Sequence, residues 1–159
     1  MIKKLRQLAA DERGTSLIEM ALATPFLAAV LTGMVDLSRA YSEKLQLEQA
    51  AQRSIEKVMN NQTTSTSYNT LKAEAAEAAA VAETDVTIDY WLECNGVRQG
   101  DGTPGNGYDG SCTTGQAYAR YLTVEVEKDF IPTFGTKYFP GANGDGSYTI
   151  RSEAGIRTQ

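Results

Sequence analysis

The chain has 159 residues, a formal net charge of −5 and no histidine. This length accommodates one membrane helix and one modest domain, and it is too short for two full-sized domains. The cations are scattered outside the first thirteen residues, which argues against nucleic acid as a ligand because duplex binding depends on clustered Lys and Arg.

The chain begins with a basic leader that precedes an apolar run. The leader holds four cations, Lys3, Lys4, Arg6 and Arg13. Residues 17–35 then form an apolar segment, which at about 1.5 Å per residue reaches about 28 Å, close to the ~30 Å hydrocarbon thickness. No Ala-x-Ala-like cleavage site follows, so a secretory signal removed after its apolar core is disfavoured. Because the cations precede the span, we expect a cytoplasmic N-terminus and an extracytoplasmic C-terminal domain.

Two residues of the apolar run are unusual for a membrane helix. Glu19 places a carboxylate near its start, where an ionised group costs at least a few kcal/mol unless it stays at the interface or finds a partner. Pro25 follows, and we expect a helix kink or a loosened turn there, tolerated where neighbouring helices or a local 3₁₀ adjustment satisfy the carbonyl.

The spacing of Gly14 and Glu19 carries a resemblance. The basic leader, Gly14, the residues 15–18 and a glutamate five positions after the glycine resemble the prepilin signal of type IV pilins and pseudopilins. That resemblance implies cleavage by a prepilin peptidase between Gly14 and Thr15. It also implies that Glu19 meets the new amine of a neighbouring subunit inside the membrane.

Further residues are similar to one branch of these proteins. Residues 19–27, 33–41 and 150–157 resemble TadE-like minor pilins of tight-adherence (Tad) type IV pili. The resemblance implies a minor pilin or pseudopilin that primes, caps or regulates assembly of a Tad pilus used in surface adherence. Its partners would be the prepilin peptidase, the major pilin, a second minor pilin and the assembly platform of the bacterial inner (cytoplasmic) membrane. The expected domains are a prepilin leader (1–14), a transmembrane or assembly helix (15–36) and an extracytoplasmic pilin-like head (37–159).

The helix is expected to continue beyond the membrane. From Asp36 to about Met59 the sequence lacks Gly and Pro and is rich in good helix formers. One stripe at helical spacing collects Leu37, Ala40, Tyr41, Leu47, Ala51, Ile55 and Val58. A polar linker at residues 60–67 ends this helix, and the alanine-rich stretch from Leu71 to Glu83 predicts a second short helix.

From Asp85 onward the period changes to two. Apolar and polar residues alternate over residues 85–94, 122–127 and 148–157, which predicts strands with one wet face each. Such alternation is typical of an antiparallel sheet covered on one side, here by the long helix. The predicted fold is α+β, with two helices on an antiparallel sheet of about three to four strands.

Seventeen residues separate the two cysteines, Cys94 and Cys112. In a domain outside the cytoplasm this spacing predicts a disulfide that closes a loop, and two unrelated buried thiols are the alternative. Long glycine-rich loops at 95–111 and 131–147 offer oxygen ligands that could bind calcium, Asp101, Asn106, Asp109, Asn143 and Asp145. Their spacing matches no EF-hand and the same residue types are common in turns, so we predict no metal site and no cofactor.

No catalytic constellation emerges from the sequence. There is no histidine to activate a serine or cysteine, and no phosphate-binding glycine motif precedes a helix. Glu125 and Glu127 fit a solvated sheet face better than a glycosidase pair, so we do not expect an enzyme. Two rival functions stay open, an uncleaved signal-anchored extracytoplasmic binding protein and a type II secretion pseudopilin. The first rival leaves the spacing of Gly14 and Glu19 unexplained.

Overall fold

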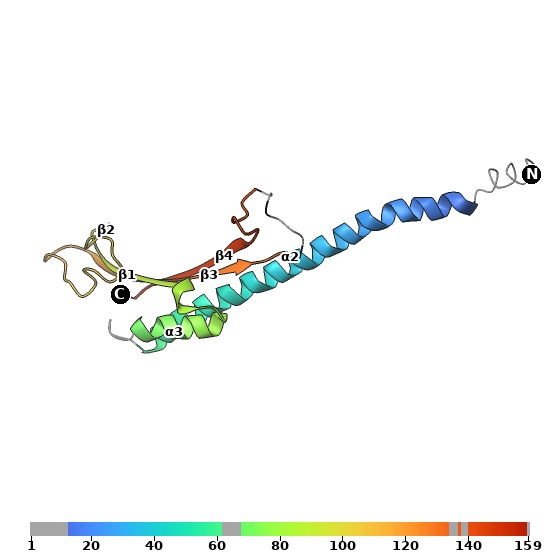
Figure 1. Ribbon diagram of the computed structural model, residues 1–159. Coiled ribbons are helices and arrows are strands. Elements are labelled where there is room, and N and C mark those ends of the chain that lie inside the picture. The colour runs from blue at the N-terminus through green and yellow to red at the C-terminus, as the bar shows by residue number, and fades with distance from the viewer. Residues whose placement is uncertain (1–12, 62–67, 134–136, 138–139, 159) are drawn as a thin grey trace, which may run out of the picture. The chain divides into compact units, whose positions relative to one another are not determined.

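A computed structural model describes residues 13–61, 68–133, 137 and 140–158 (Figure 1). The predicted leader therefore lies outside the described residues, except for its last two positions. The elements in chain order are α2 (Arg13–Asn61), α3 (Tyr68–Ala79), the 3₁₀ helix η2 (Glu83–Asp85), β1 (Val86–Cys94), β2 (Val97–Arg98), β3 (Tyr118–Phe130) and β4 (Tyr148–Arg157). The fold is α+β, as the sequence predicts. The chain divides into two compact units, the first ending at Arg39 and the second starting at Ala40.

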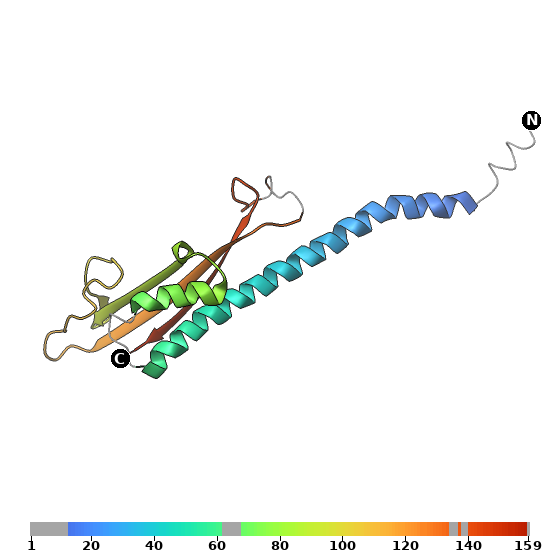
Figure 2. The same ribbon diagram turned by 60° about the horizontal axis from the view of Figure 1, so that its bottom comes forward.

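The second unit is built on a four-stranded antiparallel sheet in the order β2-β1-β3-β4 (Figure 2). The register pairs Val86 with Val126 and Tyr90 with Leu122, so these side chains share one face. Leu122, Val124 and Val126 on this inner face are fully buried. The alternation that the sequence displays thus marks which face of the sheet joins the core.

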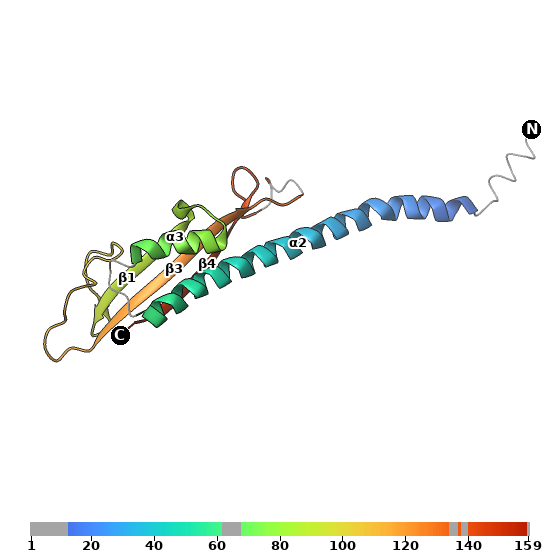
Figure 3. The same cartoon turned by 90° about the horizontal axis from the view of Figure 1, so that it is seen from below.

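Two helices cover this inner face (Figure 3): α3 and the part of α2 within the second unit. The helical part of the core consists of Leu47, Ala50, Ala51, Ile55, Val58, Leu71, Ala75, Ala76 and Ala79. An ion pair between Lys57 and Glu74 joins the two helices. Lys44 of α2 donates a hydrogen bond to the Arg151 carbonyl oxygen of β4 at 2.6 Å. Small alanine side chains let α3 lie close to its neighbours.

The predicted helical stripe is wrong at its beginning. Leu37 and Tyr41 are 72 and 65 % exposed, whereas the buried stripe begins at Leu47. Tyr41 lies about 120° around the helix from Leu47, because each residue turns the helix by about 100°. Tyr41 therefore does not face the core. Between Tyr41 and Leu47 the helix contacts the sheet through polar groups. Glu43 Oε2 lies 3.6 Å from Lys128 Nζ of β3.

The strands match the prediction, with one addition. β3 runs from Tyr118 to Phe130 and is longer than the predicted 122–127, because its first residues pair with β1 and its last residues pair with β4. The short strand β2 was not predicted. It forms a hairpin with β1 through Asn95 and Gly96, which both adopt positive φ, 51° and 79°. Those values match the type I′ turn that an Asn-Gly pair favours.

Helix α3 begins at Tyr68 and ends at Ala79, so the predicted range of 71–83 is displaced. The end is set by Ala80, whose φ of 53° is left-handed. The Ala80 and Val81 amides donate to the Glu77 and Ala76 carbonyl oxygens at 3.2 and 3.0 Å. This is the Schellman pattern, which usually places glycine at the left-handed position. The sequence gives no signal for this C-terminal end of α3, because the alanine residues that continue past it favour helix.

Replacing Ala80 by glycine should stabilise the protein, because glycine adopts a left-handed conformation without the steric cost that a Cβ atom imposes. We expect Ala80→Gly to raise the free energy of unfolding by up to about 1 kcal/mol. The matched control is Ala73→Gly at an exposed position inside α3, which should lower it by about 1 kcal/mol. Chemical denaturation followed by circular dichroism measures both, and destabilisation by Ala80→Gly would contradict the assigned helix end.

Candidate functional site

The first unit exposes an almost continuous apolar helix surface. Leu17, Leu22 and Phe26 are 75, 74 and 71 % exposed. By length and composition, the described helix Leu17–Met59 is able to cross a membrane, and its most apolar window has no residue buried inside the protein. Large exposed apolar surfaces mark membrane or protein contacts. This helix therefore fits a single-pass membrane anchor.

The hydroxyl groups within the apolar run are satisfied inside the helix. Thr24 Oγ1 donates to the Met20 carbonyl oxygen at 2.6 Å, and Thr32 Oγ1 donates to that of Ala28 at 2.9 Å. A lipid environment provides no water to solvate such groups, so internal bonding is what a membrane helix requires. Both threonines are compatible with a span.

The predicted processing and assembly residues all lie on α2. Gly14 and Thr15 belong to its first turn, and Pro25 lies inside it. Glu19 is exposed, and within the described residues no ion pair involves it. The helix continues through Pro25, so the predicted kink remains a prediction. The described part of α2 thus carries an exposed acid on an apolar surface.

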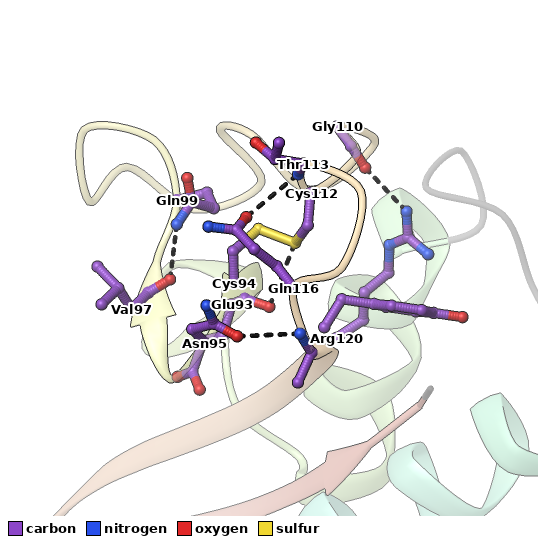
Figure 4. Close-up of a disulfide and its surroundings, with 12 residues drawn as sticks. Glu93, Cys94, Asn95, Val97, Gln99, Gly110, Cys112, Thr113, Gln116 and Arg120 are labelled. Atoms are coloured by element: carbon purple, nitrogen blue, oxygen red, sulfur yellow. Dashed lines mark hydrogen bonds between the residues drawn. A yellow bond between two sulfur atoms is a disulfide. The ribbon is translucent and has the colours of Figure 1, made fainter.

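Within the second unit, Cys94 and Cys112 form the predicted disulfide (Figure 4). Their Cα atoms lie 5.6 Å apart. Hydrogen bonds also hold this region together. The Ala117 amide donates to Asn95 Oδ1 at 2.9 Å, and the Thr113 amide donates to Gln116 Oε1 at 3.1 Å. The disulfide thus joins the end of β1 to a loop that is already ordered by local hydrogen bonds.

Tyr108 anchors this loop in the core, which the sequence reasoning missed. Its side chain is only 7 % exposed and meets Tyr90 edge to face, with ring centroids 5.2 Å apart. Arg120 donates to the carbonyl oxygens of Tyr108 and Gly110, both at 3.0 Å. A Cβ atom at Gly105 would approach the Tyr90 ring to 2.5 Å, so the loop packs directly against β1. A tyrosine within a glycine-rich stretch is the only signal that the sequence offers for this anchor.

The outer face of the sheet carries a second cluster that was not predicted, formed by Asp89, Trp91, Arg98 and Tyr121. The Trp91 and Tyr121 rings stack 5.3 Å apart, and the Arg98 guanidinium lies 4.8 Å from the Trp91 ring. Arg98 also donates two hydrogen bonds to Asp89, at 2.7 and 2.8 Å, and these raise the pKa of Arg98. Both Trp91 faces are therefore engaged, which indicates a cross-strand stabilising cluster.

Two of the acids considered as calcium ligands, Asp101 and Asp145, accept hydrogen bonds within turns. The Thr103 amide donates to Asp101 Oδ1 at 2.9 Å, and the Ser147 amide donates to Asp145 Oδ1 at 3.0 Å. These bonds lower the pKa of each carboxyl. Asn143 donates to the Ser147 and Thr149 hydroxyls. The described residues contain no group of three or more His, Cys, Asp or Glu side chains that could hold a metal ion.

Opening the disulfide should weaken the second unit. The double substitution Cys94→Ser/Cys112→Ser removes a cross-link over a sequence separation of 18 residues, and we expect a loss of about 3 kcal/mol in the free energy of unfolding. Denaturant titration of the full chain in detergent, with and without reductant, measures the loss. Reductant should destabilise the wild-type protein and leave the double variant unchanged. An unchanged wild-type midpoint under full reduction would contradict this role.

Comparison with known proteins agrees with the N-terminal helix. Residues 14–55 match the family described as TadE-like protein. No curated protein and no solved structure matches the chain. The matched segment contains Gly14, Thr15, Glu19 and Pro25, and it confirms the resemblance drawn from the sequence. Residues 14–55 are thus similar to TadE-like proteins, and the match covers about a quarter of the chain.

Proposed function

We propose that this chain is a minor pilin or pseudopilin that a prepilin peptidase cleaves and that primes, caps or regulates assembly of a Tad-type pilus. The observation that carries the proposal is Glu19 on an exposed apolar helix, five residues after Gly14 and within the segment that matches TadE-like proteins. An exposed apolar surface of this kind is unfavourable in water and does not suit a soluble domain. It suits a subunit that passes from the membrane into an assembly, because both surroundings are apolar.

Processing comes first in this proposal. The peptidase cuts the peptide bond between Gly14 and Thr15 at the cytoplasmic side of the membrane, where a residue without a side chain suits a narrow site. The cut removes the leader, which contains four cations and two acids, so the net charge changes from −5 to −5 − 2 = −7. It also exposes the α-amino group of Thr15, which is a cation in its protonated form.

Assembly then uses the electrostatics of the apolar phase. A carboxylate alone in a low-dielectric medium is strongly destabilised, and pairing with a cation recovers much of that cost. The Glu19 carboxylate of one subunit and the Thr15 amine of its neighbour form such a pair. Because both charges occupy fixed positions on α2, their pairing selects one axial register between neighbouring helices.

The partners follow from this arrangement. Residues 15–36 form the transmembrane and assembly helix in the bacterial inner membrane, with the N-terminus in the cytoplasm and the head of residues 37–159 outside. The major pilin, a second minor pilin and the assembly platform contact the apolar helix. The disulfide-closed head contributes a binding surface rather than a reaction.

Cleavage is tested by intact mass and N-terminal sequencing of the membrane-extracted protein, from cells with and without active prepilin peptidase. We expect the wild-type chain to begin at Thr15 only where the peptidase is active. Gly14→Leu should begin at Met1 in both strains, because the enlarged side chain blocks the site, and Gly33→Leu serves as the control that is still cleaved. Wild-type protein that begins at Met1 in both strains would refute the proposal and favour an uncleaved signal-anchored binding protein.

The role of Glu19 is tested separately from cleavage. Glu19→Gln keeps the shape of the side chain and removes its charge, so the variant should be cleaved normally. It should recover at least about tenfold less of its pilin partners on co-purification, because the neighbouring amine is left unpaired in the apolar phase. Glu56→Gln, at an exposed position of α2 in the second unit, is the matched control. Equal recovery with Glu19→Gln and Glu56→Gln would contradict the charge pair.

A further inference from the structure

Strand β4 is the last strand of the sheet, and its outer edge faces away from β3 (Figure 2). The Thr158 amide donates to the Arg120 carbonyl oxygen at 2.8 Å, so Thr158 is hydrogen-bonded to β3. Bonding alternates along an antiparallel pair, so the odd-numbered residues 149–157 direct their N–H and C=O groups outward. The bond from Lys44 to the Arg151 carbonyl oxygen agrees with this pattern.

The C-terminal half of this edge is open. Glu153, Gly155 and Arg157 are exposed. Within the described residues, the outward backbone groups of Glu153 and Gly155 have no hydrogen-bond partner. An exposed row of this kind is a template for another strand, and charged side chains on it restrict which strands fit. The charges of β4 therefore indicate the partner.

The edge is complementary to itself. We propose that β4 pairs with β4 of a second copy of this chain, antiparallel and centred on Gly155. This register places Glu153 opposite Arg157 of the second copy, and Arg157 opposite the second copy's Glu153. Residues 153, 155 and 157 share the outer face, so both pairs of opposite charges lie on the same side of the joined sheet. Arg157 also donates to the Tyr118 carbonyl oxygen at 3.2 Å, which its five N–H donors permit.

A charge imbalance within one chain supports this partner. Glu153 lies directly opposite Glu125 of β3, and like charges in that position destabilise a sheet. The neighbouring acid Glu127 is compensated, since its Oε1 atom lies 3.1 Å from Arg151 Nε. No ion pair of Glu153 is present in the part of the chain that the structure describes. The Arg157 guanidinium of a second copy supplies the missing cation.

The symmetry of this strand pair determines how the two heads are oriented relative to one another. An antiparallel pair of identical strands has a two-fold axis perpendicular to the sheet, which reverses every direction in its plane. The parts of α2 that cover the sheet, from Ala40 onward, then leave the joined heads in opposite directions. We place the two heads on opposing membranes or filaments, which makes this a homotypic adhesive contact that does not depend on leader cleavage.

Full-length protein reconstituted in phosphatidylcholine vesicles with outward heads tests this contact through vesicle clustering, followed by turbidity. Wild-type vesicles should cluster and should disperse at high salt, because exposed charge pairs are screened. Vesicles carrying Glu153→Arg alone, or Arg157→Glu alone, should not cluster. The controls Glu56→Arg and Arg53→Glu, both on exposed positions of α2, should cluster like wild type.

Mixing the two edge variants gives the sharpest result. Glu153→Arg vesicles mixed with Arg157→Glu vesicles should cluster again, because each charge on one edge then faces its opposite on the other. Failure of the mixture to cluster would overturn the register centred on Gly155. Absence of clustering by wild-type vesicles would overturn the proposal entirely, while cleavage at Gly14 is scored by its own experiment.

Discussion

The central physical constraint is an apolar helix surface in the first unit that the described residues do not cover. Apart from the half-buried Thr32, the side chains along residues 17–35 are exposed, and a carboxylate, Glu19, lies among them. Lipid satisfies the apolar side chains but leaves the acid unfavourable, whereas a neighbouring helix with a positive charge satisfies both. Under the proposed function, the same surface would be stable in the membrane and more stable in an assembly. That difference is what would drive a subunit from one to the other.

In the second unit, long loops must be held in place by a small core. Two devices hold the loop after β2: the disulfide between Cys94 and Cys112, and Tyr108 inserted beside Tyr90. On the opposite sheet face, Arg98 connects Asp89 to Trp91 across two strands. These contacts stabilise the sheet without requiring a helix on its outer side. Among the described residues, the outer face and the C-terminal half of the β4 edge have no helix packed on them.

Much of this architecture could be predicted from the sequence because it follows from period and composition. The long helix, the alternating strands and the disulfide all depend on local patterns that are visible in the chain. What was missed depends on tertiary contacts or on competing propensities. Ala80 ends α3 in a left-handed conformation that alanine rarely adopts, and Tyr108 leaves a glycine-rich loop to enter the core. The β2 hairpin did have a local signal, the pair Asn95-Gly96, which favours a tight hairpin turn. The prediction relied on the period-two pattern and did not use this pair.

The central claim is that the Glu19 carboxylate pairs with the N-terminal amine of a neighbouring subunit. The most direct measurement treats isolated Tad assemblies with a lipid-soluble carbodiimide, which converts a carboxylate and an adjacent amine into an amide, and identifies the product by mass spectrometry. The account predicts a cross-link between Glu19 and the first residue of another subunit, absent from Glu19→Gln assemblies. A carbodiimide adduct on Glu19 without any cross-link to an N-terminal amine would contradict it.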